Sequence, residues 1–155
     1  MSRVKTLIIA PASPLTSEGR ALIEGSQSAL LEVFSPDEIF TFAAEELARP
    51  DITFLTARDG DGPALACVAM ADCGDYAEVK RLYVPPAARG LGLARALMLA
   101  LEARARAAGK LWVRLETGEK LVAAVALYRA LGYLARGPFG DYPDHPASLF
   151  MEKKL

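Results

Sequence analysis

The stretch that decides the fold is Val84-Pro-Pro-Ala-Ala-Arg-Gly-Leu-Gly-Leu-Ala-Arg-Ala-Leu-Met98. It follows a run of β-branched and aromatic residues at 79–84, and it leads directly into an amphipathic pattern. Between the two lies a loop that carries Arg89, Gly90 and Gly92. Glycines let a bulky anion approach the backbone, and the unpaired N–H groups of a helix start carry partial positive charge. The stretch therefore predicts a strand, a turn that binds a pyrophosphate, and a helix.

Two common phosphate-binding motifs fit this loop poorly. A P-loop needs Gly-Lys-Ser/Thr, which does not follow, and a dinucleotide fingerprint needs glycine at the position of Arg95. The pattern that fits is Arg-x-x-Gly-x-Ala, formed by Arg89, Gly92 and Ala94. It resembles the acyl-CoA-binding motif of the GCN5-related N-acetyltransferases, the GNAT family.

Further matches follow in the family's order. Residues 111–118 are expected to form a strand, and residues 123–133 a helix that Gly132 ends. That helix contains Ala-x-x-Leu-Tyr-x-x-x-Gly-Tyr, which is similar to the family's signature and places Tyr128 at its tyrosine. Residues 77–84 resemble the family's fourth strand, and residues 138–154 resemble the end of many small bacterial members. The specific resemblance covers residues 77–154.

Hydrophobic periodicity predicts an α/β chain with a mixed sheet and helices on both sides. The expected strands are residues 4–10, 52–57, 64–71, 77–84 and 111–118, followed by two more strands near the end. The expected helices are residues 17–34, 36–48, 90–108 and 123–133, with Glu102 largely outside the apolar face of the third. The resemblance implies the GNAT acyl-CoA N-acyltransferase fold, whose mostly antiparallel sheet contains a splayed parallel pair.

Composition sets the remaining bounds. The 155 residues are 52% hydrophobic and 24% charged, which predicts a single globular domain spanning residues 1–155. A net charge of −1 argues against nucleic acid as a partner, and no run is long enough to span a membrane. The N-terminus lacks a signal-peptide pattern, so we expect a cytoplasmic protein. Cys67 and Cys73 are expected to be free thiols, and no residue spacing suggests a bound metal.

The resemblance implies an acetyl-CoA-dependent enzyme that transfers an acetyl group to a primary amine of a small molecule or peptide by direct attack. Backbone N–H groups from Arg89 to Ala94 would hold the pyrophosphate, and Arg89 and Arg95 would add positive charge. Leu82 and Val84 would pair with the pantetheine arm through their backbones. The complete expected cofactor-binding set is Leu82, Tyr83, Val84, Arg89, Gly90, Leu91, Gly92, Leu93, Ala94, Arg95 and Tyr128.

The candidate catalytic residues are a phenol and two carboxylates. Tyr128, at the family's tyrosine, is protonated at neutral pH and can donate a proton to a leaving thiolate. Glu116 is the first candidate for general base, because some protein N-terminal acetyltransferases of the family carry their catalytic glutamate at this position. Glu78, on the adjoining strand, is the rival, and solvent could also take the proton.

The loop after residue 136 supplies candidates for acceptor binding. Phe139, Asp141 and Tyr142 could contact the substrate, with Asp141 attracting a cationic amine. His145, the one histidine, is expected to be a surface residue. At position 121 many relatives have Asn or Gln, where this chain has Leu121, so cofactor binding would depend more on backbone contacts.

Two alternatives remain open from the sequence. The chain could be a non-catalytic acyl-CoA-binding or regulatory module, an interpretation to which Leu121 gives some weight. It could also be a protein N-terminal α-amine acetyltransferase, which Glu116 and Tyr128 would suit, although no peptide-recognition motif is visible. Dimers are common in the family, so a homodimer is possible.

Overall fold

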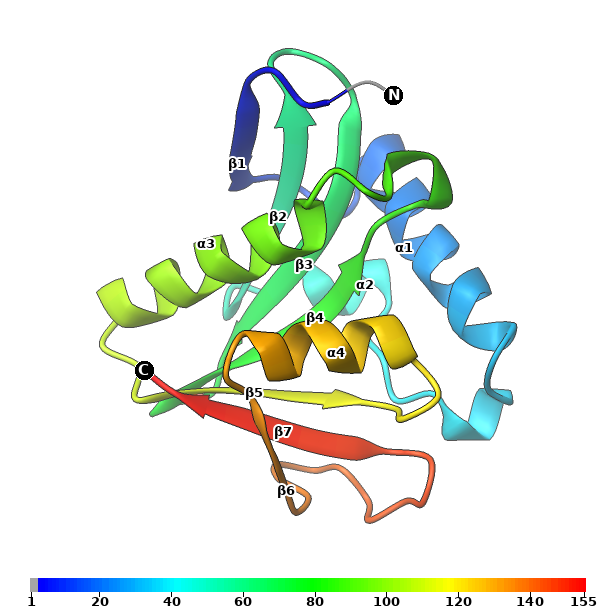
Figure 1. The fold of residues 1–155 in the computed structure, drawn as a ribbon, viewed down its shortest axis with the longest axis vertical. Coiled ribbons are helices and arrows are strands. Elements are labelled where there is room, and N and C mark those ends of the chain that lie inside the picture. The colour runs from blue at the N-terminus through cyan, green and yellow to red at the C-terminus, as the bar shows by residue number, and fades with distance from the viewer. Residues whose placement is uncertain (1–2) are drawn as a thin grey trace.

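The computed structural model describes residues 3–155 (Figure 1). Its strands are β1 (Leu7–Pro11), β2 (Ile52–Asp59), β3 (Ala64–Asp72), β4 (Tyr76–Tyr83), β5 (Trp112–Thr117), β6 (Leu134–Arg136) and β7 (Leu149–Lys154). Its α-helices are α1 (Ser17–Leu31), α2 (Ala44–Leu47), α3 (Leu93–Ala107) and α4 (Val122–Ala130), with short 3-10 turns at Pro36–Glu38 and Pro86–Ala88. No helix of these residues is long and apolar enough to cross a bilayer.

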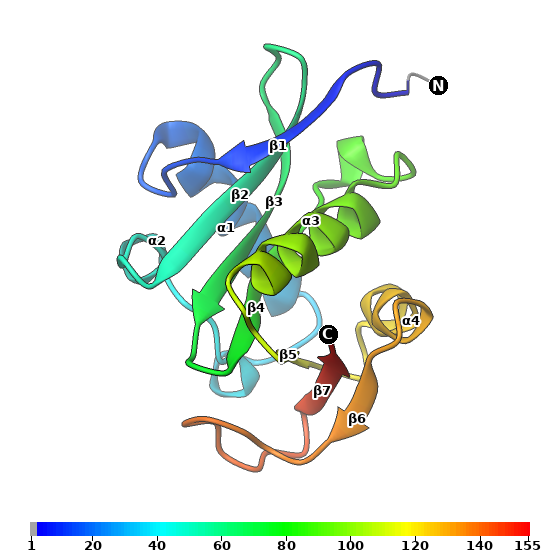
Figure 2. The same cartoon turned by 90° about the vertical axis from the view of Figure 1, so that its left-hand side faces the viewer.

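The seven strands form one sheet in the order β1-β2-β3-β4-β5-β7-β6. The β4–β5 pair is parallel, and the other pairs are antiparallel. Helices cover both faces, α1 and α2 on one and α3 and α4 on the other (Figure 2). Successive residues of β2 explain this, because Phe54 packs in the α1–α2 core and Leu55 in the α3–α4 core. The predicted fold class, a mixed sheet with helices on both sides, is confirmed.

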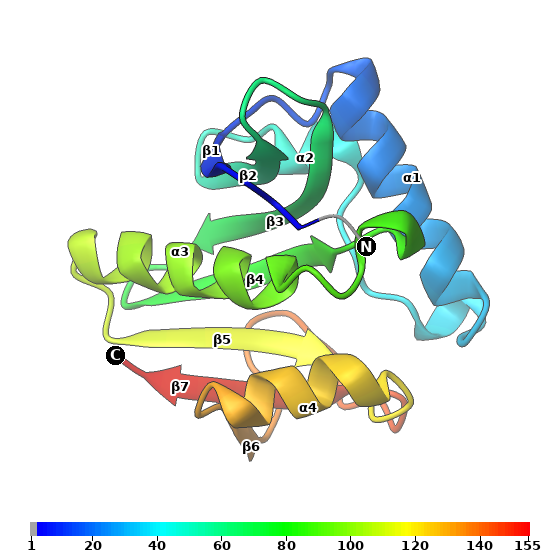
Figure 3. The same ribbon diagram turned by 45° about the horizontal axis from the view of Figure 1, so that its top comes forward.

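The two parallel strands pair over only part of their length. Their register runs from Tyr76↔Trp112 to Val79↔Leu115 and stops there, although both strands continue. Just beyond this point Arg81 has a φ of +49°, and the β3–β4 register shifts between Cys67 and Ala69. This bulge bends β4 away from β5. Figure 3 shows β4 and β5 running in the same direction, with β5 between α3 and α4. The candidate site lies at the resulting gap between the ends of β4 and β5.

The predicted helix over residues 36–48 is wrong. The N-terminal signal itself is present, since the Ser35 N–H donates to Glu38 Oε1 at 2.9 Å. The chain then becomes extended over residues 39–43, here called the strap, before the short helix α2. The strap contains β-branched and aromatic residues, which favour extended backbone. Arg81 Nε also donates to the Phe42 carbonyl oxygen at 3.1 Å, so this tertiary contact stabilises the extended form.

The prediction for Glu102 is also wrong, because its side chain is only 1% exposed. Two groups from elsewhere in the chain compensate the buried carboxylate. The Tyr133 hydroxyl donates to Oε2 at 2.8 Å, and Lys153 Nζ donates to Oε1 at 2.8 Å. Helical spacing placed Glu102 largely outside the apolar face. Its burial is explained by Lys153 on β7 and by Tyr133, which lies between α4 and β6.

Both cysteines are free, as the sequence predicts. Cys67 lies in the interior of β3, where burial raises the pKa of its thiol to about 12. Its thiol is therefore protonated and unreactive at neutral pH.

Candidate active site

A groove of about 590 Å³ runs between α1, the end of β4, the start of α3 and α4. Most of the residues expected to bind the cofactor line it: Leu82, Tyr83, Val84, Arg89, Gly90, Gly92, Leu93, Ala94 and Arg95. Leu91 packs against the α3–α4 core instead, and Tyr128 lines a second cavity described below. Leu121, Val122 and Ala123 from the start of α4 form the opposite wall. The glycine loop and the end of β4 thus line the same groove.

The start of α3 leaves backbone donors free at this groove. Gly92 is the N-cap residue and has a φ of +76°, a conformation that glycine adopts without strain. Within residues 3–155, the backbone N–H groups of residues 90–95 donate no hydrogen bond. Arg89 is exposed, and its Nε lies 3.4 Å from the Val84 carbonyl oxygen. The cluster of free N–H groups with Arg89 and Arg95 beside it can hold an anionic group.

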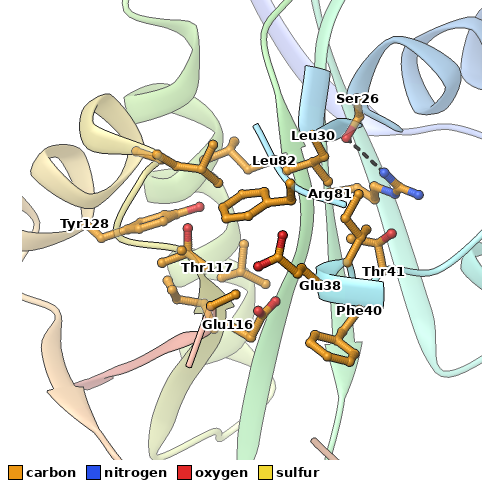
Figure 4. Close-up of a pocket in the computed structure, with 18 residues that line it drawn as sticks. Ser26, Leu30, Glu38, Phe40, Thr41, Arg81, Leu82, Glu116, Thr117 and Tyr128 are labelled. Atoms are coloured by element: carbon orange, nitrogen blue, oxygen red, sulfur yellow. Dashed lines mark hydrogen bonds between the residues drawn. The ribbon is translucent and has the colours of Figure 1, made fainter. Parts of the chain in front are cut away.

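A smaller cavity of about 120 Å³ continues from this groove into the gap between β4 and β5. Both are lined by Ser26, Leu30, Leu82, Leu121 and Ala124. Figure 4 shows Glu116 and Tyr128 projecting into this cavity from β5 and α4. We call it the reaction cavity. It brings together the first-choice acid and the first-choice base, which the sequence had placed twelve residues apart.

Tyr128 is held by its packing. The side chain is 6% exposed, and its ring meets the Tyr133 ring edge-on at 5.9 Å between centroids. Burial raises the pKa of Tyr128, and the nearby charge of Glu116 raises it further. The phenol therefore remains protonated through the neutral range and is a proton donor rather than a base.

Glu116 has the properties expected of a carboxylate that titrates near neutrality. Burial raises the pKa of its side chain to about 7, and the nearby charge of Glu78 acts in the same direction. Lys80 and the hydroxyl of Ser148, which donates to Oε2 at 2.8 Å, oppose this rise. A carboxylate with such a pKa can accept a proton and release it again at working pH.

Glu78 lies outside the reaction cavity, in a neighbouring cavity of about 420 Å³. Its carboxylate is already paired, since Lys80 Nζ lies 3.0 Å from Oε2 and the Tyr142 hydroxyl also donates to Oε2. Lys80 in turn donates to the Tyr142 hydroxyl at 2.8 Å. Burial raises the pKa of Tyr142, as does the neighbouring Glu78 charge. This network fixes the loop between β6 and β7 on the sheet.

The candidate acceptor-binding residues of that loop lie in different surroundings. Asp141 is exposed and, with Tyr142, lines the 420 Å³ cavity. Phe139 is 7% exposed, and its ring packs against Tyr76, Tyr142 and Phe150 instead of lining either cavity. His145 is half-buried, with its ring edge-on to Phe40 at 5.6 Å.

Sequence reasoning missed the strap and the residues beside it. Glu38, Phe40 and Thr41 line the reaction cavity, although the sequence predicted a helix here and singled out none of the three as site residues. The Ile-Phe-Thr-Phe run at 39–42 could have indicated extended backbone. No local signal could have indicated the contact between Phe40 and His145, because the two residues lie far apart in the chain.

The model of the acetyltransferase (GNAT) family matches residues 20–133. A protein of Azospirillum brasilense named IAA acetyltransferase is 43% identical over 149 residues, which cover 95% of this chain and 97% of that protein.

Solved structures show the same architecture. A proposed acyl-CoA N-acyltransferase from Klebsiella pneumoniae superposes with a TM-score of 0.79 and 34% identity, over 96% of this chain and 97% of that chain. YncA from Salmonella typhimurium, a proposed acetyltransferase solved with acetyl-CoA, has a TM-score of 0.71 and 21% identity over 97% and 95% of the two chains. The second likeness concerns the fold alone.

Proposed function

The chain belongs to the GNAT family of acetyltransferases, and on that basis we propose that it uses acetyl-CoA to acetylate a primary amine of a small molecule or peptide. The observation that carries this proposal is the continuity of two cavities. The groove with the free N–H groups opens into the reaction cavity with Glu116 and Tyr128. A thioester that extends along the groove would therefore end between a proton acceptor and a proton donor.

The groove residues fit two parts of acetyl-CoA, the pyrophosphate and the pantetheine arm. The N–H groups of residues 90–95, with Arg89 and Arg95, would hold the pyrophosphate. The backbone at Leu82 and Val84, beyond the end of the β4–β5 ladder, would hydrogen-bond the pantetheine amides. Leu121 lines both cavities and offers only an apolar contact, so the pantetheine would be recognised by backbone groups on the β4 side.

The role of the glycine loop in binding the pyrophosphate can be tested at Gly92. An L-residue at its φ of +76° costs about 1–2 kcal/mol, so Gly92→Ala should distort the turn and raise the KM for acetyl-CoA about tenfold. Gly60→Ala is the matched control, because Gly60 also has positive φ, +57°, and open space, but lies in the β2–β3 turn. Steady-state kinetics should show an unchanged KM for the control. Equal KM values for both variants would contradict the assignment.

The chemical step follows from the positions of two side chains. Glu116 would take a proton from the incoming amine, directly or through a water molecule, and the amine nitrogen would attack the thioester carbonyl carbon. The C–N bond forms as the C–S bond breaks, and Tyr128 would give its proton to the departing thiolate. The products are the N-acetyl amine and CoA thiol, and solvent returns the two side chains to their starting states.

We assign the base to Glu116 rather than Glu78 on geometry. Glu116 lines the cavity that Tyr128 also lines, whereas Glu78 is paired with Lys80 in the neighbouring one. Glu78 would act on the reaction only through its charge, which raises the pKa of Glu116.

The pH dependence of kcat/KM separates the two carboxylates. A base must be deprotonated, so the wild-type rate should fall about tenfold per pH unit below a pKa near 7. Glu116→Gln should remove this limb and lower kcat/KM at pH 8 at least tenfold. Glu78→Gln should keep the limb but move it to lower pH, because a negative charge beside Glu116 is lost. The reverse pattern would assign the base to Glu78.

The function itself is tested by acetyl-CoA-dependent thiol release with amino acids, polyamines, aminoglycosides and short peptides with free N-termini. Release with one class of amine would establish the reaction and the acceptor class, and release with peptides alone would favour protein N-terminal acetylation. If acetyl-CoA raises the melting temperature but no amine causes release, the chain functions as an acyl-CoA-binding module.

A further inference from the structure

The reaction cavity and the 420 Å³ cavity meet at the strap. Phe40 and Thr41 line both spaces. Phe40 carries the larger side chain, and its ring is held edge-on against His145 at 5.6 Å. The contact joins the strap to the loop between β6 and β7, and the Phe40 ring lies at the boundary of the two cavities.

The strap that carries this ring is fixed to the sheet. Arg81 donates to the Phe42 carbonyl oxygen at 3.1 Å, to Ser26 Oγ at 3.2 Å and to Gln27 Oε1 at 2.8 Å. The strap is thereby tied to both α1 and β4. Thr41 Oγ1 also donates to Gln27 Oε1 at 3.3 Å. Phe40 is therefore positioned on a supported segment between two cavities.

The two spaces differ in what they can hold. An apolar cavity of roughly 150 Å³ holds one benzene ring, so an amine that carries an aryl group would have to extend beyond the 120 Å³ reaction cavity. The neighbouring 420 Å³ cavity is large enough, and the rings of Phe42, Tyr76 and Tyr142 line it. Its buried charges, Glu78 and Lys80, are paired with each other. The charged residues Glu46, Arg49, Asp51 and Asp141 also line it, and the three aromatic rings form the apolar part of its wall.

We propose that Phe40 sets the size limit of the acceptor: its ring restricts the native acceptor to a small aliphatic amine, and its removal opens an aryl-binding subsite among Phe42, Tyr76 and Tyr142. This inference rests on the proposed acetylation of an amine at the reaction cavity. It adds a specificity-determining residue and a substrate class to that function.

The test compares the binding of ethylamine and 3-phenylpropylamine by calorimetry, with the protein saturated with CoA. Phe40→Ala should raise the affinity for 3-phenylpropylamine relative to ethylamine at least tenfold over wild type, as expected for burying an aromatic ring. Phe42→Ala is the matched control, because Phe42 lies on the same strap but lines only the larger cavity. It should give no gain.

A second variant controls for the possibility that Phe40→Ala destabilises the strap. His145→Ala removes the ring that holds Phe40 but leaves the strap sequence unchanged, and it should give a smaller gain in the same direction. An aryl-to-ethyl affinity ratio that is the same in wild type and both variants, including no binding of either amine, would overturn the proposal. Thiol release by the wild-type protein decides the proposed function separately, since the binding ratio requires no turnover.

Discussion

Replacing Tyr128 with phenylalanine is expected to lower kcat about 100-fold, the usual loss when a general acid is removed. The KM for acetyl-CoA should change less than about twofold, because phenylalanine keeps the buried ring and its edge-on contact with Tyr133. The hydroxyl faces the reaction cavity, so its loss affects the proton delivered to the thiolate and leaves the packing intact (Figure 4). Steady-state kinetics at saturating amine provides the measurement.

Tyr133→Phe is the matched control for this experiment. It removes a hydroxyl from the other ring of the same pair, but that hydroxyl donates to Glu102 in the core. We expect kcat to stay within about twofold and the free energy of unfolding to fall by about 1.5 kcal/mol. A Tyr128→Phe enzyme with near wild-type kcat would show that water, and not this phenol, protonates the thiolate.

Replacing Lys153 with methionine is expected to lower the free energy of unfolding by about 3 kcal/mol. The variant leaves the buried Glu102 carboxylate with the Tyr133 hydroxyl and with Arg106, whose Nη2 is 3.9 Å away. Unfolding in urea measures the loss, and the melting temperature should fall by about 6–12 °C. Lys154→Met, at the exposed neighbouring position, should have little effect.

The pairing of Lys153 with Glu102 can be separated from simple packing by a double replacement. Changing both Glu102→Leu and Lys153→Met removes both charges, so no uncompensated carboxylate remains buried. This protein should be more stable than the one with Lys153→Met alone. If Lys153→Met and Lys154→Met are equally stable, the ion pair contributes nothing to the fold.

Local sequence patterns predicted the elements whose conformation is determined by residues close to one another in the chain. Strand alternation and glycine turns predicted the hairpin β2–β3 and the strand before the glycine loop. The helix that follows the glycine loop, α3, begins three residues later than expected. The prediction failed over residues 36–48, where the capping signal of Ser35 is satisfied within one turn. The strap is set instead by Arg81, a residue from a distant strand.

The residues of the candidate site divide in the same way. The glycine loop, Tyr128 and Glu116 lie on segments with a clear pattern, and the structure brings all three to the connected cavities. The pairing of Glu78 with Lys80 follows from their spacing on one strand, but the part played by Tyr142 does not. Contacts between the strap and the β6–β7 loop depend on how the whole chain folds, and no short segment encodes them.

Because the pairing of β4 with β5 ends early, each of these two strands has an unpaired edge in the interior of the sheet. Exposed strand edges usually invite another chain to pair with them, which is a route to aggregation. Here α1 and α4 form the two walls of the groove that leads to these inner edges. A strand of another protein, with side chains on both faces, would collide with those helices, whereas a thin unbranched chain could enter. The gap between β4 and β5 leaves backbone groups unpaired, and the helices on either side of it prevent the strands of another copy from pairing with them.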